Sequence, residues 1–258
     1  MGKVIAIVNQ KGGVGKTTSA VNLAAAVGDK GYKALLADID PQGNATSGLG
    51  INKRALEQSA YDVMINSVPA KDVILESEYE NVWVLPSNMA LAGAELELVD
   101  MDRRESRLKT ALAPVKADFD FIFFDCPPSL GLITLNALCA SDTVMVPIQC
   151  EYYALEGLSQ LMSTVRQVKR LYNPMIEIEG VLLTMYDGRL NLTQQVVDEV
   201  KRFFPRKVYS SVIPRNVRLS EAPSFGQPVM YYDRSSKGTS AYNDFADEFL
   251  RMNGKKSN

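Results

Sequence analysis

Histidine is absent from all 258 residues of this chain, and cysteine occurs only three times. The absence of histidine excludes Ser-His-Asp and Cys-His catalysis, and it excludes any metal site built on imidazole ligands. Cys126, Cys139 and Cys150 show no C-x-x-C spacing. We therefore interpret the thiols as core residues of a protein in a reducing cytoplasm.

Long apolar runs and a large net charge are also missing. No run approaches the roughly 20 apolar residues that cross a bilayer, and the chain begins without the pattern of a signal peptide. The formal net charge of −2 does not favour a strong overall attraction to nucleic acid. Hydrophobic residues make up 46% of the chain, which is enough for the core of one α/β domain or at most two.

The most informative segment is rich in glycine and runs from Gln10 to Thr18, as Q-K-G-G-V-G-K-T-T. It follows an apolar β-branched run and precedes an alanine-rich segment, so it is predicted to join a strand to a helix. Glycine lets backbone N–H groups approach a phosphate, and the helix N-terminus adds partial positive charge. Lys16 is predicted to reach the β- and γ-phosphates, and Thr17 to ligate Mg²⁺. The alternative is a tight turn with two solvated lysines.

Two aspartate-containing turns follow predicted strands. Asp38 ends the predicted strand 33–38, and Asp40 lies in the turn that follows it. At this place the two carboxylates are suited to holding Mg²⁺ indirectly or to orienting a water molecule, although the same residues are typical of an ordinary capped turn. Asp125 ends the buried run 119–125, the arrangement of a Walker B strand, in which the aspartate holds Mg²⁺. The prolines after Asp125 predict an extended turn able to sense the γ-phosphate.

Strand and helix patterns alternate along the chain. This alternation predicts an α/β protein with a three-layer P-loop NTPase fold, in which helices cover both faces of a twisted, mostly parallel sheet. We expect a single ATPase domain over 1–252 and a flexible tail over 253–258. Residues 44–50 are expected to form a loop, and 240–252 an amphipathic helix.

Four motifs resemble those of the ParA/MinD ATPases, and most closely the Soj-type chromosomal ParA proteins. K-G-G-x-G-K-T-T resembles their deviant Walker A loop, and D-x-D-P-Q-G-N-x-T at 38–46 resembles their second motif. Residues 151–157 resemble E-Y-x-A-L-x-G, and 213–223 resemble I-P-R-x-x-R-L-S-E-A-P. The resemblance covers nearly the whole chain.

The resemblance implies an ATPase that forms an ATP-bound sandwich homodimer, binds double-stranded DNA non-specifically and releases it after hydrolysis stimulated by a ParB-type centromere-binding protein. Its expected task is the segregation of a chromosome or plasmid, on the nucleoid in the cytoplasm. The resemblance also allows a further role in replication initiation or sporulation. Lys11 would complete the partner's site, and Asp40 would act in hydrolysis. ATP contacts are expected from Lys11, Gly12, Gly13, Val14, Gly15, Lys16, Thr17, Thr18, Pro214 and Asn216.

The resemblance also assigns DNA contacts to Arg189 and Arg218. Between 201 and 237, eight basic residues face only two acidic ones. A basic face formed by two copies would bind phosphates without reading bases. Charge alone is equally consistent with a solvated surface.

Four alternative functions remain. A MinD-like, membrane-associated ATPase that positions cell division would need a basic amphipathic C-terminal helix, whereas 240–252 carries several acidic residues. An electron-transfer protein of the nitrogenase-reductase type would need paired cysteines. A ligase of the dethiobiotin-synthetase type would need a substrate pocket that the sequence does not indicate. A pure DNA-binding module would leave the aspartates unexplained.

Overall fold

The computed structural model of the chain describes residues 2–151 and 156–256. The segment 152–155, part of the E-Y-x-A-L-x-G resemblance, lies outside the described residues, as do the last two residues of the predicted tail.

The described part of the chain contains one eight-stranded sheet with the order β3-β4-β2-β5-β1-β6-β7-β8. All neighbouring strands are parallel except β3 and β4. The strands are β1 (Lys3–Ile7), β2 (Ala34–Asp38), β3 (Leu75–Glu76), β4 (Val82–Leu85), β5 (Phe121–Asp125), β6 (Thr143–Gln149), β7 (Glu177–Tyr186) and β8 (Val208–Pro214). The fold class predicted from the alternating pattern is confirmed.

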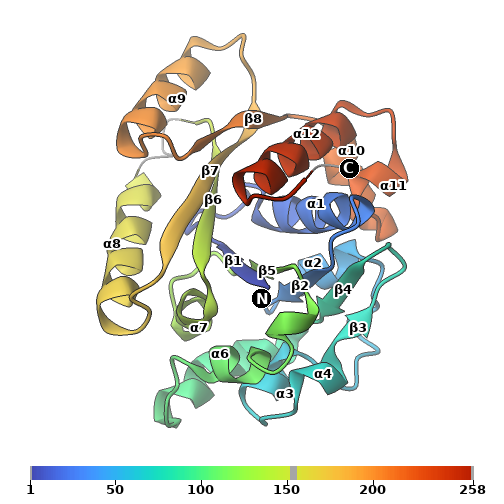
Figure 1. Cartoon of the computed structure of the whole chain (residues 1–258), viewed down its shortest axis with the longest axis vertical. Coiled ribbons are helices and arrows are strands. Elements are labelled where there is room, and N and C mark those ends of the chain that lie inside the picture. The colour runs from blue at the N-terminus through green and yellow to red at the C-terminus, as the bar shows by residue number, and fades with distance from the viewer. Residues whose placement is uncertain (1, 152–155, 257–258) are drawn as a thin grey trace.

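Helices cover both faces of the sheet, as Figure 1 shows. One face is covered by α1 (Lys16–Asp29), α2 (Asn44–Gly48), α10 (Val217–Glu221), α11 (Val229–Tyr232) and α12 (Lys237–Met252). The other is covered by α3 (Ala60–Met64), α4 (Ala70–Val73), α5 (Ala94–Glu97), α6 (Arg107–Leu112), α7 (Leu132–Ala140), α8 (Glu156–Leu171) and α9 (Asn191–Phe203). Short 3-10 turns are η1 (Met89–Gly93), η2 (Leu98–Asp100), η3 (Lys116–Asp118) and η5 (Ala222–Phe225).

The strand register brings the predicted loops to one edge. Ile7 at the end of β1 and Asp38 at the end of β2 are both paired with Asp125 at the end of β5. In a parallel sheet the carboxyl ends of neighbouring strands meet, and ligands bind there. The glycine-rich loop and both aspartate turns therefore converge at this edge, although they are far apart in the sequence.

Residues 44–48 differ from the prediction, because they form α2 rather than a loop. Local propensity in Asn-Ala-Thr-Ser-Gly is low, and the helix depends on tertiary contacts. Gly43 precedes it with φ of 62°, and the Thr46 amide and hydroxyl both donate to the buried Asp38 carboxylate.

The chain after α12 makes several contacts up to residue 256. The Asn253 side-chain amide donates to Glu179, the Lys255 ammonium pairs with Asp120, and the Lys256 carbonyl accepts from Tyr32. These contacts fix the described part of the segment predicted as a tail.

We predict that Phe249→Ala lowers the free energy of unfolding by about 3–5 kcal/mol. Phe249 is fully buried, and its ring centroid lies 5.0 Å from that of Phe121 and 5.7 Å from that of Phe123. Chemical denaturation is the measurement, with the half-exposed Met252→Ala on the same helix as control. Equal effects of the two variants would contradict this assignment of the core.

Candidate active site

The glycine-rich loop adopts a conformation that demands glycine at two positions. Gly13 has φ of 73° and Gly15 has φ of 87°, values that side-chain-bearing residues rarely adopt. Gly15 is the N-cap of α1, so the helix begins at the phosphate-binding lysine. The Thr184 hydroxyl of β7 donates to the Val14 carbonyl at 2.8 Å and holds the loop against the sheet.

The two lysines of the loop have different environments. Lys16 is 7% exposed, and its Nζ donates to the Lys11 carbonyl at 3.1 Å. Burial lowers the pKa of Lys16, and the nearby Asp125 carboxylate offsets part of this effect. Lys11 is half-exposed, and its Nζ lies 3.5 Å from the Glu151 carboxylate. One lysine therefore turns inward to the phosphate position, and the other remains available at the surface.

Asp125 has the properties of a cation ligand. It is fully buried, and neither carboxylate oxygen has a hydrogen-bond partner in the described part of the chain. Burial, and then the Asp38 carboxylate, raise the pKa of Asp125 well above its usual range, while neighbouring Thr17 and Lys16 act in the opposite direction. An unpaired buried carboxylate beside a hydroxyl suits Mg²⁺, which takes oxygen ligands.

The acidic residues do not form a complete metal cage. Among the described residues, no group of three or more acidic, cysteine or histidine side chains is placed to hold a metal ion. Mg²⁺ is commonly bound by one or two protein ligands together with substrate phosphates. Asp125 and Thr17 fit that pattern, in which the nucleotide supplies the remaining oxygens.

Asp38 is committed to protein contacts. Its Oδ2 accepts from the Thr46 amide at 2.8 Å and from the Thr46 hydroxyl at 2.7 Å, and its Oδ1 accepts from the Asp40 amide at 3.2 Å. Burial raises the pKa of Asp38 to about 6, although these hydrogen bonds lower it. These contacts favour a role in fixing the loop of Asp40 over direct metal binding.

Asp40 is almost completely buried, and hydrogen bonds hold both its backbone and its side chain. Ser87, which follows β4, donates its hydroxyl to the Asp40 carbonyl at 2.8 Å, and Asp40 Oδ1 accepts from the Gln42 amide at 2.9 Å. The sequence analysis did not find Ser87. No local pattern marks it, because its partner lies 47 residues earlier.

A cavity of about 280 Å³ joins the glycine-rich loop to the end of β8. Gly15 and Thr18 line one side, and Pro214 and Asn216 line the other. Asn216 also begins α10, where its side chain accepts from the Arg218 amide. The residues predicted to contact adenine are thus next to the predicted phosphate site.

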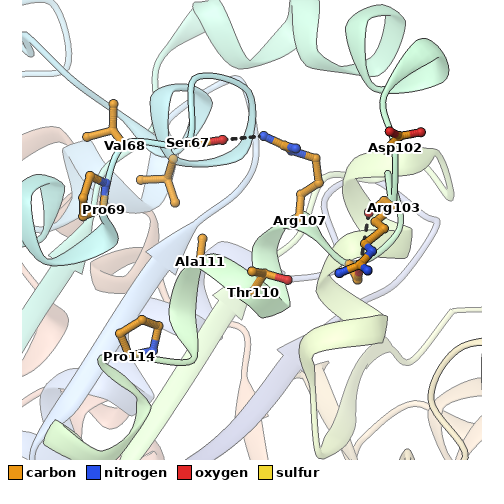
Figure 2. A pocket seen from close by; sticks show the side chains of 11 residues that line it. Ser67, Val68, Pro69, Asp102, Arg103, Arg107, Thr110, Ala111 and Pro114 are labelled. Carbon is orange, nitrogen blue, oxygen red and sulfur yellow. Dashed lines mark hydrogen bonds between the residues drawn. The ribbon is translucent and has the colours of Figure 1, made fainter.

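A second cavity, of about 420 Å³, lies between α6 and the segment joining α3 to α4. Figure 2 shows Arg107 reaching across it to Ser67, and the same guanidinium donates to the carbonyls of Met64 and Ile65. Arg107 therefore connects α6 to the end of α3 and the segment after it. None of the predicted site residues lines this cavity.

The two arginines predicted to contact DNA are exposed and paired with carboxylates. Arg189, in the turn between β7 and α9, contacts both oxygens of Asp187. Arg218, in α10, contacts Glu221 at 2.7 Å and Asp233 at 3.1 Å. Exposed ion pairs are weak, so a phosphate can displace these carboxylates at small cost.

Fold and site together define a P-loop nucleotide-binding protein of the α/β class. The family model described as "AAA domain" matches residues 2–178. The sporulation initiation inhibitor protein Soj of Bacillus subtilis is 59% identical over 96% of this chain and 98% of its own length. The chromosome partitioning protein ParA of Myxococcus xanthus is 50% identical over 100% of this chain and 91% of its own.

A solved structure agrees with these relatives. Cobyrinic acid a,c-diamide synthase from Mycobacterium smegmatis, with bound ATP analog and magnesium, has a TM-score of 0.88 and 38% identity, covering 100% of this chain and 98% of that one. Soj and ParA match this chain over nearly its full length. The chain therefore belongs to the ParA/Soj family of chromosome-partitioning ATPases.

We predict that Thr46→Val destabilises the protein by about 1–3 kcal/mol at pH 7, because it leaves the buried Asp38 carboxylate short of a donor. The folded-state pKa of Asp38 is already raised, so its stabilising contribution is present at low pH and is lost as the pH rises through about 6. Removing the hydroxyl raises that pKa further.

The destabilisation should therefore be larger at pH 7.5 than at pH 5, as measured by denaturation across this range. Ser47→Ala on the same short helix is the control, because the Ser47 hydroxyl donates to the Gly43 carbonyl and not to Asp38. A Thr46→Val effect that does not change with pH would refute the role given to Asp38.

Proposed function

We propose that this chain is a Mg²⁺-dependent ATPase switch that pairs when ATP is bound and grips duplex DNA only as a pair. Hydrolysis, stimulated by a ParB-type centromere-binding partner, then releases the DNA, and repeated cycles segregate a chromosome or plasmid. The observation that carries this proposal is the buried Asp125, whose carboxylate has no hydrogen-bond partner within the described residues and lies next to Thr17 and the inward-facing Lys16.

Phosphate binding follows from the loop. The Lys16 ammonium and the amides of Gly13 to Thr18 would contact the phosphates, with the base in the cavity beside Pro214 and Asn216. Mg²⁺ would be held by Thr17 directly and by Asp125 through water, and it would neutralise charge that develops on the phosphates. The solved relative with ATP analog and magnesium supports this choice of ligands.

Hydrolysis needs a group that orients the attacking water. Asp40 is suited to this, because its loop is fixed at two points while its side chain remains at the carboxyl edge of the sheet. Lys11 is half-exposed and its exposed ion pair with Glu151 is weak, so it can leave to contact the nucleotide of a second copy.

Membrane attachment through the last helix is not favoured. None of the helices within the described ranges is long and apolar enough to cross a membrane. The apolar face of α12, including Tyr242, Phe245 and Phe249, is buried in the core and is not available to lie on a lipid surface. We therefore favour the nucleoid over the membrane as the place of action.

We predict that Asp40→Ala abolishes ATP turnover but not ATP binding, and that it accumulates as a dimer in ATP. Loss of the group that orients the water costs hydrolysis, whereas the phosphate contacts persist. Light scattering with ATP and with ADP gives the mass, and phosphate release gives the turnover. A monomeric Asp40→Ala protein in saturating ATP would contradict the pairing.

Gly12→Val provides the opposite variant. A Cβ added at Gly12 has no atom within 4 Å, so there is open space beside this residue within one chain, and we expect the valine side chain to collide with a partner. We expect ATP binding without dimer formation in the same light-scattering experiment. ATP-dependent pairing at wild-type strength would count against a contact between the two loops.

We predict that Arg218→Glu weakens duplex DNA binding and lowers its salt dependence, while ATP turnover without DNA stays unchanged. Each lost phosphate contact should reduce the slope of log K against log salt by about 1 per chain. Arg170→Glu is the control, because Arg170 lies in the last turn of α8, which covers the other face of the sheet from α10, next to Lys169, which pairs with Glu177. Identical salt titrations for the two variants would refute the DNA-binding assignment.

A further inference from the structure

Helix α7 begins after the turn that follows Asp125, and a distant glutamate caps it. Its own N-cap residue is Gly131, which has no side chain to offer. Glu95 of α5 supplies the acceptors instead: Oε2 accepts from the Leu132 amide at 2.8 Å, and Oε1 accepts from the Ile133 amide at 3.3 Å. A carboxylate at a helix N-terminus satisfies unpaired amides and interacts favourably with the helix dipole.

Gly131 is matched to this contact. A Cβ added at Gly131 would lie 2.5 Å from Glu95 Oε1, so any side chain at this position would displace the carboxylate. The φ of Gly131 is −81°, a value open to every residue. The glycine is therefore explained by the close approach of Glu95 and not by backbone strain.

The other end of the same segment holds the loop of Asp40. Ser87 is fully buried, its hydroxyl donates to the Asp40 carbonyl at 2.8 Å, and its amide donates to the Thr46 hydroxyl at 2.9 Å. Between the two ends, Asn88 caps η1 through the Ala90 amide, and Leu91 and Ala94 are fully buried. The segment 87–95 is thus anchored in the core at Ser87, Leu91 and Ala94, while Met89 between them is exposed.

We propose that the segment 87–95 is a brace that sets the position of Asp40 relative to the turn after Asp125, with Ser87 and Glu95 as its positioning residues. This inference rests on the proposed role of Asp40 in hydrolysis. The turn 126–131 leads from Asp125 into α7, and the Thr134 hydroxyl of α7 donates to the Ser129 carbonyl at 2.6 Å. A shift of this turn would move the start of α7, and Glu95 would move with it because it is hydrogen-bonded to α7. The segment 87–95 would then displace Ser87 and with it the loop of Asp40.

Glu95→Gln is the first test. Glutamine keeps one acceptor but presents an amide group to the second backbone N–H, so one of the two hydrogen bonds is lost. Because small misplacements of a positioned group strongly affect rate, we expect kcat for ATP to fall at least about tenfold, with the Kd for ATP within about twofold of wild type. Glu97→Gln is the matched control, because both oxygens of the Glu97 carboxylate accept from the Tyr61 hydroxyl of α3.

A double-mutant cycle tests transmission along the brace. Ser87→Ala should lower kcat in the same way, and Ser87→Ala combined with Glu95→Gln should be no slower than the slower single variant, within about twofold. Multiplied effects would mean that the two ends act separately, and they would overturn the brace.

Gly131→Ala disturbs the contact between Glu95 and α7 from the α7 side, because the added methyl group displaces the carboxylate. The φ of Gly131 is open to alanine, so the substitution does not strain the backbone. It should lower kcat as Glu95→Gln does, and it should have no further effect when Glu95 is replaced by alanine, which leaves room for the methyl group. A wild-type kcat for both Glu95→Gln and Gly131→Ala would overturn the proposal.

Asp40→Ala, measured in parallel, separates this proposal from the one on which it rests. If Asp40→Ala loses turnover while Glu95→Gln keeps it, the brace alone is refuted. If Asp40→Ala keeps wild-type turnover, the role of Asp40 is refuted and the brace with it. An equal loss of ATP affinity and kcat in Glu95→Gln would show a general structural defect and would also refute the brace.

Discussion

The arrangement of this site depends on two acidic side chains, Asp38 and Asp125, that are buried close together. The parallel register pairs Asp38 with Asp125 at the ends of neighbouring strands, and both carboxylates are fully buried. Burial raises the pKa of each, and the Asp38 carboxylate raises the pKa of Asp125 further. Asp38 accepts hydrogen bonds from Thr46 and Asp40, whereas neither oxygen of Asp125 has a hydrogen-bond partner among residues 2–151 and 156–256. A divalent cation bound with its nucleotide would supply what the fold leaves out.

The loops around this point are held by contacts that reach across the sheet. Thr184 of β7 fixes the glycine-rich loop, Ser87 after β4 fixes the loop of Asp40, and Glu95 fixes the start of α7. Each is a single side chain bonded to backbone groups of a loop that follows a different strand. In the proposed switch, such contacts would position the loops that respond to the γ-phosphate.

The shared architecture does not decide the biological task. A synthase of a cofactor precursor and chromosome-partitioning proteins have chains similar to this one along nearly their full length. Their common part is the nucleotide site, so differences in task must arise at the surface. In this chain the surface features that matter are the exposed, weakly paired arginines near the ends of β7 and β8, and a last helix whose apolar face is used by the core.

The sequence alone determined the fold class, the phosphate-binding loop and the two aspartate turns, because those features depend on local periodicity and on residue types that the chemistry requires. It did not reveal α2, whose residues have little helical propensity and which depends on the buried Asp38. It also did not reveal Ser87 or Glu95, whose partners are 47 and 37 residues away. Only the tertiary structure decided that Asp38 is hydrogen-bonded while Asp125 has no hydrogen-bond partner in the part of the chain that the structure describes, because Thr46 reaches Asp38 from the helix α2, which the local sequence does not predict.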